Sequence, residues 1–209
     1  MSRSVLLVLN GLPDPGLLAR VIPGQPLLQP LGEEPARPPV TEIVAVDGGL
    51  AALEAVGLRP DRILGDLDSI AWERLQYWRQ AGVPIDHRPD PASSDLEKAL
   101  EYAATSGFSH VDIAGWQGTR WDHVLGLLSL LDHEPRQHPR LLSGRQTLRV
   151  LTAGTHDFSA RPATGLAWCV SAPGPAGSHW PAWSTSPTTS CWKPVAARPP
   201  TACASPASG

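Results

Sequence analysis

Two aspartates stand two positions apart behind a short apolar run, in Ile63-Leu64-Gly65-Asp66-Leu67-Asp68-Ser69-Ile70. On an extended chain, side chains two positions apart point to the same face, about 6.6 Å apart along it, so both carboxylates could face one cation. Carboxylate oxygens suit Mg²⁺, which keeps its remaining positions for water and phosphate oxygens. Because Gly65 permits a turn and Ser69 could cap a helix, an ordinary surface turn is the simpler alternative.

A second polar set follows in Ser94-Asp95-Leu96-Glu97-Lys98. Ser94 and Glu97 form a capping-box pattern, which predicts a helix that begins here and continues to about residue 106. Asp95 could be a third metal ligand, or it could only interact favourably with the helix dipole. Lys98 lies on the same helical face, where it could meet a phosphate or remain a solvated lysine.

A third polar set surrounds a glycine-containing loop at residues 115–120. The backbone N–H groups of this loop and the Arg120 guanidinium precede a predicted helix, which is a suitable arrangement for binding an anion. Asp122 and His123 follow at once, and a helix cap and a structural histidine are their simpler interpretations. Together with Asp47, which follows an earlier strand, these sets are typical of metal-assisted phosphoryl or pyrophosphoryl transfer.

The predicted elements place all of these residues at one edge of a sheet. Short apolar runs alternate with amphipathic stretches of about ten residues, which indicates an α/β fold of three α/β/α layers with a mostly parallel, Rossmann-like sheet. In such a sheet, ligands gather at the carboxyl ends of the strands. Strands are expected at residues 4–9, 42–46, 62–64, 83–87, 110–114 and 147–151, and helices near 16–21 and at 50–56, 71–80, 95–106 and 121–131.

Two of these helices carry specific packing predictions. Residues 121–131 are apolar almost all round, so this helix is expected to be buried. In the helix at 71–80, Trp72 and Leu75 are expected to face inward.

Composition excludes several classes of function. The chain has 209 residues and a net charge of −3, so it offers no broad cationic surface to nucleic acid or to a membrane. The apolar run at residues 5–9 is too short for a signal peptide or a membrane span, which favours a cytoplasmic protein. Cys169, Cys191 and Cys203 match no zinc spacing and, being odd in number, indicate no disulfide framework.

The last part of the chain has a different composition. Residues 160–209 contain nine prolines and four tryptophans, and no aspartate or glutamate follows Asp157. No helical or strand period is present, so no element is predicted there. We therefore divide the chain into an α/β domain at residues 1–155 and an irregular tail at 156–209.

Four blocks of the α/β domain resemble thiamine pyrophosphokinase in order and spacing. They are Val46-Asp47-Gly48-Gly49-Leu50-Ala51, the run from Gly57 to Ser69, Ser94-Asp95-Leu96-Glu97-Lys98-Ala99-Leu100, and Gly118-Thr119-Arg120-Trp121-Asp122-His123. The Pro-Asp-x-x-x-Gly-Asp-x-Asp-Ser pattern in the second block is the most specific. The resemblance implies transfer of the terminal diphosphate of ATP to the hydroxyl of thiamine, giving thiamine diphosphate and AMP, with Mg²⁺ as cofactor.

The resemblance also implies roles for single residues. Mg²⁺ would be held by Asp66, Asp68 and Asp95, and Asp122 would complete the catalytic group. The nucleotide would be bound by Asp47, Gly48, Gly49, Ser94, Lys98, Gly118, Arg120 and His123. The family's glycine pair before the arginine is Gly118-Thr119 here, and the threonine of its Thr-Asp pair is Ser94, which keeps the hydroxyl.

The tail departs from the family altogether. The family's second domain is a β-sandwich that helps form its homodimer and its thiamine pocket, and residues 156–209 do not resemble it. One permitted choice of codons for residues 177–205, read two nucleotides on, encodes a Gly-Leu-x-Tyr run and an Asn-Arg pair like those of the missing segment. Our hypothesis is a reading-frame shift between about residues 160 and 173, with no homodimer expected of the present tail.

Two alternatives stay open. One is a different Mg²⁺-dependent pyrophosphokinase, or a phosphohydrolase, that uses the same sheet edge. The other is a nucleotide-binding protein without turnover, which the tail favours and the complete acidic set argues against.

Overall fold

The computed structural model describes residues 2–12, 14–25, 37–118, 120–133, 139–143 and 147–149, together with two strands at 166–170 and 182–186. It divides into two units. The second unit holds β8 (Leu166–Val170) and β9 (Ala182–Ser186), which pair antiparallel. The first unit holds the other elements and every residue singled out for the candidate site.

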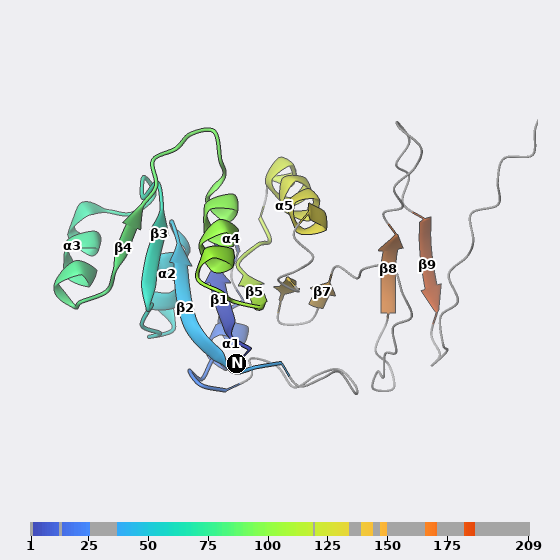
Figure 1. Cartoon of the computed structure of the whole chain (residues 1–209), viewed down its shortest axis with the longest axis horizontal. Coiled ribbons are helices and arrows are strands. Elements are labelled where there is room, and N and C mark those ends of the chain that lie inside the picture. The colour runs from blue at the N-terminus through green and yellow to red at the C-terminus, as the bar shows by residue number, and fades with distance from the viewer. Residues whose placement is uncertain are drawn as a thin grey trace, which may run out of the picture. The chain divides into compact units, whose positions relative to one another are not determined.

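A seven-stranded sheet forms the centre of the first unit (Figure 1). Its strands lie in the order β4-β3-β2-β1-β5-β6-β7, and all neighbours are parallel except β6 and β7. The chain builds outward from β1 as far as β4 and then crosses back to place β5 on the other side of β1. The strands are β1 (Ser4–Val8), β2 (Val40–Val46), β3 (Arg62–Gly65), β4 (Ile85–His87), β5 (His110–Ala114), β6 (Arg140–Leu142) and β7 (Thr147–Arg149).

Helices cover both faces of this sheet, which confirms the predicted three-layer α/β/α fold. Successive strand residues alternate between two apolar clusters: Leu7 belongs to the cluster under α4 and α5, and Leu6 and Val8 belong to the cluster under α1, α2 and α3. The helices are α1 (Pro15–Leu18), α2 (Gly49–Ala55), α3 (Trp72–Gln80), α4 (Asp95–Thr105) and α5 (Trp121–His133).

Helix α4 begins with the predicted capping box. Ser94 Oγ accepts a hydrogen bond from Glu97 N–H at 3.3 Å, and Glu97 Oε2 accepts one from Ser94 N–H at 2.6 Å. The bond from the Ser94 N–H holds the pKa of Glu97 below its usual value. The predicted apolar face is buried against the sheet, namely Leu96, Ala99, Leu100 and Ala103. These two constraints fix the first turn of α4, where Asp95 lies.

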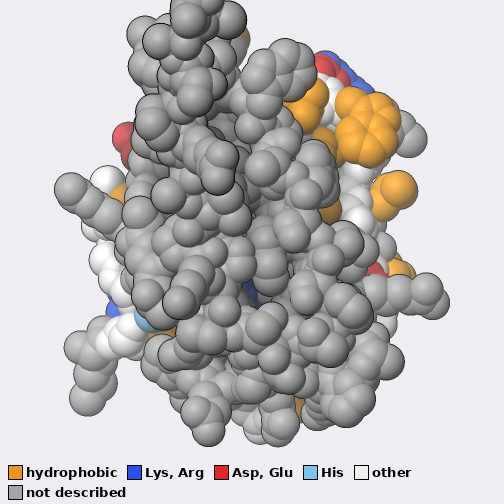
Figure 2. All heavy atoms as spheres, turned by 90° about the vertical axis from the view of Figure 1, so that its right-hand side faces the viewer, with side chains coloured by type: hydrophobic (Ala, Val, Ile, Leu, Met, Phe, Trp, Pro, Cys, Tyr) orange, Lys and Arg blue, Asp and Glu red, His pale blue; other side chains and the backbone are white. Residues whose placement is uncertain are grey.

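Helix α5 departs from the prediction that it is buried. Leu127 and Leu131 are buried, whereas Trp121 is 74% and Leu125 63% exposed. The prediction is wrong because an outer helix of a three-layer fold packs on the sheet through one face only. Exposed hydrophobic side chains are visible on the side of the molecule that Figure 2 shows. In the described part of the chain, no helix has both the length and the apolar character needed to cross a membrane.

Three smaller predictions also differ. Trp72 is 65% exposed, because it lies at the first position of α3 while Leu75 occupies the inward position. The three-residue strand β6 was not predicted, since so short a run has no visible period. Strands β8 and β9 form where no element was predicted, and the rest of the tail lies outside the described residues. The domain boundary at residue 155 stays a prediction.

A buried ion pair joins β5 to β6. Asp112 and Arg140 are 1% and 2% exposed, and Arg140 donates from Nε and Nη2 to the two carboxylate oxygens at 2.8 Å each. Arg37, just before β2, donates from Nη1 to the same carboxylate at 3.1 Å. Burial lowers the pKa of Arg37 to about 10, because loss of water disfavours the charged guanidinium. One carboxylate therefore ties together three segments that are distant in sequence.

We predict that Asp112→Ala lowers the free energy of unfolding by about 3–5 kcal/mol, because it leaves Arg140 charged, buried and unpaired. Urea unfolding followed by circular dichroism measures this loss. Glu101→Ala is the matched control: its carboxylate pairs with Arg88 but is 71% exposed, so its removal should cost less than about 1 kcal/mol. Equal losses in the two variants would contradict the prediction.

Candidate active site

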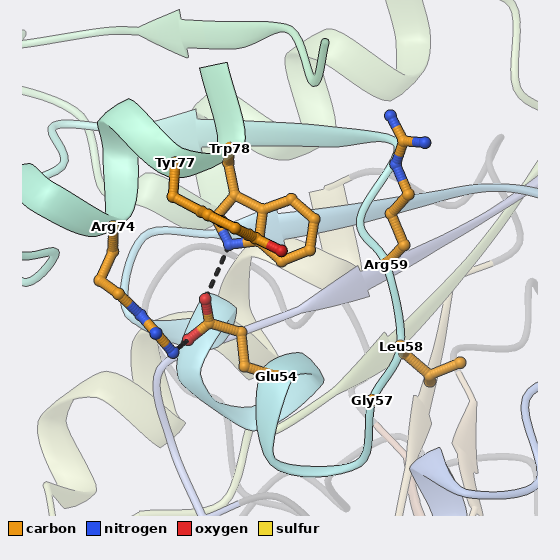
Figure 3. Close-up of a pocket in the computed structure, with 7 residues that line it drawn as sticks. All are labelled: Glu54, Gly57, Leu58, Arg59, Arg74, Tyr77 and Trp78. Carbon is orange, nitrogen blue, oxygen red and sulfur yellow. Dashed lines mark hydrogen bonds and ion pairs between the residues drawn. The ribbon is translucent and has the colours of Figure 1, made fainter. Parts of the chain in front are cut away.

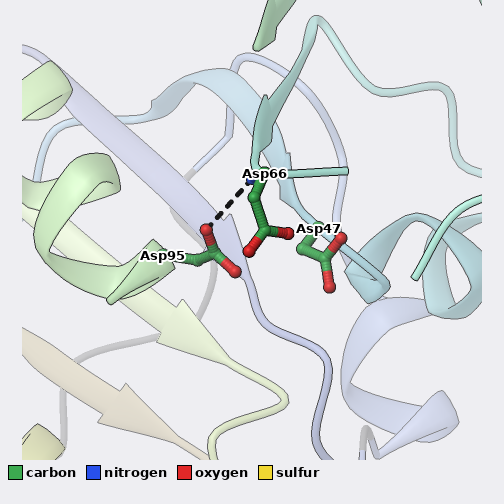
Figure 4. A group of neighbouring side chains, drawn as sticks. All are labelled: Asp47, Asp66 and Asp95. Atoms are coloured by element: carbon green, nitrogen blue, oxygen red, sulfur yellow. Dashed lines mark hydrogen bonds between the residues drawn. The ribbon is translucent and has the colours of Figure 1, made fainter. Parts of the chain in front are cut away.

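Three aspartates from three segments meet at the carboxyl edge of the sheet (Figure 4). Asp47 follows β2, Asp66 follows β3 and Asp95 begins α4; each offers an oxygen within 4.8 Å of those of the other two. Asp47 is 5% exposed, and the other two are partly buried. Carboxylates this close repel one another unless a cation lies among them. We call these residues the acidic group, and their oxygens suit a hard divalent cation.

Three residues in or beside the acidic group have positive φ angles. Asp47 and Leu67 have φ angles of 46° and 66°, in the left-handed region that residues other than glycine rarely adopt. Gly65 has a φ of 144°, and a Cβ there would lie 3.2 Å from Asp47 Cβ and 3.3 Å from Asp95 Oδ1. Gly65 therefore supplies both the predicted turn and the space in which Asp47 and Asp95 approach each other.

Asp68 lies outside the acidic group, although the sequence pattern paired it with Asp66. Strand β3 ends at Gly65, and the left-handed conformation of Leu67 breaks the extended geometry on which that pairing depended. The Asp68 N–H donates to Asp66 Oδ1 at 3.3 Å, and its carboxylate accepts from Ser69 Oγ at 3.1 Å. The third carboxylate comes from Asp47 instead, and a role for Asp68 at the metal stays a prediction.

Asp95 is held through one of its two oxygens. Its Oδ1 accepts a hydrogen bond from Asp66 N–H at 3.2 Å and another from Lys98 Nζ at 3.0 Å. Lys98 is 4% exposed, so the interpretation of a solvated lysine is wrong. The structure places its ammonium group on a carboxylate of the acidic group, and its contact with a phosphate stays a prediction.

Asn10 is a neighbour of the site that the sequence patterns did not single out. Its Nδ2 donates to Ser69 Oγ at 3.4 Å, and the Ser69 N–H donates to Asp47 Oδ1 at 3.4 Å. A signal was available, because Asn10 comes soon after β1 at the edge where Asp47 and Asp66 follow their own strands.

The Gly48-Gly49 pair allows α2 to pack closely on β1. A Cβ at Gly49 would lie 1.9 Å from the Val8 carbonyl oxygen, and one at Gly48 would lie 2.3 Å from the Asn10 side chain. A side chain at either position would push the start of α2 away from the sheet, and Asp47 lies directly before it. Nucleotide binding by Gly48 and Gly49 stays a prediction.

The predicted anion loop carries a separate charged pair. Arg120 donates from Nε to Asp122 Oδ1 at 3.2 Å and from Nη2 to Asp122 Oδ2 at 2.5 Å, and both residues are exposed. The hydrogen bonds from Arg120 lower the pKa of Asp122. Gly118 and His123 are also exposed. Among the contacts of the described residues, none joins this pair to the acidic group, so their convergence on one ligand stays a prediction.

Two grooves flank α2. The larger, of about 320 Å³, lies between the end of α2 and α3, where Glu54 accepts a hydrogen bond from Trp78 Nε1 at 2.7 Å and pairs with Arg74 (Figure 3). The smaller, of about 230 Å³, is lined in part by Gly48 and Ser69, which adjoin Asp47 and Asp68 in the chain. The smaller groove therefore lies beside the acidic group and is the candidate place for part of a substrate.

Comparison with known proteins places this site in a family. Residues 40–141, which contain every predicted site residue, match the family model described as thiamin pyrophosphokinase, catalytic domain. By this match the segment resembles a thiamin pyrophosphokinase catalytic domain. Thiamine pyrophosphokinase from Bacillus subtilis is 28% identical over 118 residues, and thiamine pyrophosphokinase 1 from Arabidopsis thaliana is 33% identical over 101 residues. These matches cover 55% and 44% of this chain, and 55% and 38% of the two relatives.

Solved structures share the fold of this domain. The crystal structure of thiamine pyrophosphokinase from Bacillus subtilis superposes with a TM-score of 0.59 at 23% identity, over 75% of this chain and 68% of that one. A thiamin pyrophosphokinase family protein from Enterococcus faecalis gives 0.60 at 24% identity, over 82% and 76%. Since the chain spans about half the length of the first curated relative and less of the second, the family assignment concerns the catalytic domain.

We predict that Gly49→Ala destabilises the α/β domain by about 1–3 kcal/mol, because the added Cβ would overlap the Val8 carbonyl oxygen. Chemical unfolding monitored by far-ultraviolet circular dichroism measures the change. Gly126→Ala in α5 is the control: nothing lies within 4 Å of a Cβ there, and alanine favours a helix over glycine by about 0.8–1 kcal/mol. Wild-type stability of Gly49→Ala would show that α2 is not packed as described.

Proposed function

We propose that this protein transfers the terminal diphosphate of ATP to the hydroxyl group of thiamine, giving thiamine diphosphate and AMP, with Mg²⁺. The observation that carries the proposal is the acidic group of Asp47, Asp66 and Asp95, which lies within the segment that matches the thiamin pyrophosphokinase catalytic domain. The names of the two curated relatives support thiamine as the acceptor.

The donor set of the acidic group fits Mg²⁺. The donors are carboxylate oxygens, which Mg²⁺ prefers. Three residues are too few to fill an octahedral shell, so positions remain for water and phosphate oxygens. Lys98 pairs with one of the three carboxylates, so two of their negative charges are left to balance a divalent cation. Bound there, Mg²⁺ would supply positive charge to the diphosphate oxygens during transfer.

In the proposed reaction the thiamine hydroxyl oxygen forms a bond to the β-phosphorus of ATP. The bond from that phosphorus to the oxygen that bridges it to the α-phosphate breaks, AMP leaves with the bridging oxygen, and the hydroxyl proton is released. Positioning and charge neutralisation dominate such transfers. Arg120, exposed beside the glycine loop, exchanges its bond to Asp122 for the phosphate oxygens of ATP, to which its planar fork can donate two hydrogen bonds.

Further roles rest on the resemblance. We propose that Gly48, Gly49, Gly118 and His123 bind the nucleotide together with Asp47 and Ser94. Asp68 and Asp122 complete the catalytic group. We also propose a cytoplasmic location, and neither nucleic acid nor a membrane as partner.

A second candidate function is nucleotide binding without turnover. The observation that favours it is the tail, which has no aspartate or glutamate after Asp157 and stands where the family has its thiamine-binding β-sandwich. Product analysis with ATP and thiamine separates the candidates. AMP and thiamine diphosphate indicate diphosphate transfer, ADP or free phosphate indicates another phosphotransferase or a hydrolase, and bound ATP without product indicates the second candidate.

We predict that Asp66→Asn lowers Mg²⁺-dependent AMP formation by more than about 100-fold, because the amide replaces a charged ligand without changing its size. AMP is measured by chromatography, and circular dichroism checks the fold. Asp14→Asn is the matched control, since asparagine caps α1 as well as aspartate does and turnover should be unchanged. AMP formation at the wild-type rate in Asp66→Asn would remove the acidic group from the reaction.

We predict that Arg120→Lys weakens the binding of ATP by about tenfold, because lysine keeps the charge but loses the fork that donates two parallel hydrogen bonds. Titration with Mg-ATP by calorimetry measures the affinity. The control is Arg79→Lys, an exposed arginine of α3, which should bind ATP as the wild type does. If Arg120→Lys also binds ATP normally, Arg120 is not a phosphate ligand.

A further inference from the structure

Lys98 is a buried cation beside the acidic group, and two features of its position destabilise its charge. It is 4% exposed, so its ammonium group has lost most of its water. It also lies in the first turns of α4, where the positive end of the helix dipole disfavours a cation. An i,i+3 pair such as the one with Asp95 stabilises a helix only slightly, by less than these costs, which indicates that the contact serves the site.

Lys98 constrains one specific atom of the site. Both donors to Asp95, the Lys98 ammonium and the Asp66 N–H, bind the same oxygen, Oδ1. Among the contacts of the described residues, Asp95 Oδ2 accepts no hydrogen bond, and it is turned away from the Asp66 N–H (Figure 4). The carboxylate is thereby fixed in rotation, with one oxygen engaged by protein donors and the other available to a ligand.

The main chain of Lys98 is itself held in place. Its N–H donates to the Ser94 carbonyl oxygen at 3.1 Å. Its own carbonyl oxygen accepts from Arg88 Nη1 at 3.1 Å. Arg88 also pairs with Asp86 on β4 and with Glu101 on α4. The ammonium group is therefore presented to Asp95 from a residue whose main-chain N–H and carbonyl oxygen are both hydrogen-bonded, as a positioning contact requires.

We propose that Lys98 is a positioning residue for the metal site. It holds Asp95 through Oδ1 so that Oδ2 faces the cation together with oxygens of Asp47 and Asp66. This inference rests on the proposed function, because it requires the acidic group to bind a divalent cation. The phosphate contact predicted for Lys98 from the sequence stays a separate prediction, which the test below distinguishes from the positioning role.

Three possible roles of Lys98 predict different effects on metal binding by the nucleotide-free protein. If Lys98 positions Asp95, its removal weakens binding of the cation. If it only offsets negative charge, its removal strengthens binding, since a repelling charge is lost. If it only contacts phosphate, its removal leaves cation binding unchanged and weakens the binding of ATP.

The test is the affinity for Mn²⁺, measured by the electron paramagnetic resonance signal of the free ion without nucleotide. Lys98→Met is expected to bind Mn²⁺ at least about tenfold more weakly than the wild type. Lys98→Gln, also neutral but able to donate a hydrogen bond to Asp95, is expected to lose less affinity. Arg62→Met is the matched control: it removes a cation that pairs with Glu42 and stacks on Tyr102 of α4, and its Mn²⁺ affinity should be that of the wild type.

Each outcome has one meaning. Wild-type protein that binds no Mn²⁺ would overturn the proposed function and not only the role of Lys98. Binding by wild type with equal or tighter binding by Lys98→Met would overturn the positioning role alone. A loss in Lys98→Gln as large as in Lys98→Met would also overturn it. If Lys98→Met does not fold by circular dichroism, Lys98→Gln decides: weaker binding supports the role, and equal or tighter binding overturns it.

Discussion

Repulsion among three carboxylates is the constraint that the rest of the domain has to meet. Their oxygens lie within 4.8 Å of one another. Two unit charges about 4 Å apart interact by about 4 kcal/mol at the effective dielectric constant near a protein surface. Each aspartate is therefore held by a different part of the fold: Asp47 by the end of β2, Asp66 by the turn at Gly65, and Asp95 by the capped start of α4.

The parallel sheet makes this convergence possible. Strands β2 and β3 are neighbours and end at the same edge of the sheet. Helix α4 packs on one face of these strands. Close packing of Gly49 on Val8 brings the start of α2, and with it Asp47, down to that edge. The site is thus a product of strand ends and helix starts, which is where open α/β sheets bind their ligands.

The ion pairs of Asp112 and the acidic group differ in how much of their negative charge is paired with cations. Asp112 has both oxygens paired with Arg140, and Arg37 donates to it as well, so this carboxylate has little capacity for another ligand. The acidic group has more negative charge than Lys98 alone can balance. Buried polar groups that are fully paired stabilise a fold, whereas groups left partly unpaired are suited to binding.

Local patterns in the sequence were enough to predict the α/β layers and the capping box of Ser94 and Glu97, because strand and helix periods and caps depend on neighbouring residues. The alternation of strands with helices predicted a parallel sheet, and with it the gathering of Asp47, Asp66 and Asp95 at one edge. Tertiary structure alone decided that the carboxylate grouped with Asp66 and Asp95 is that of Asp47, since the left-handed Leu67 turns the chain after β3. It also decided that Lys98 is buried on Asp95, that Asn10 reaches Ser69, and that one face of α5 is exposed. These outcomes depend on contacts between segments distant in the chain, and no local period records them.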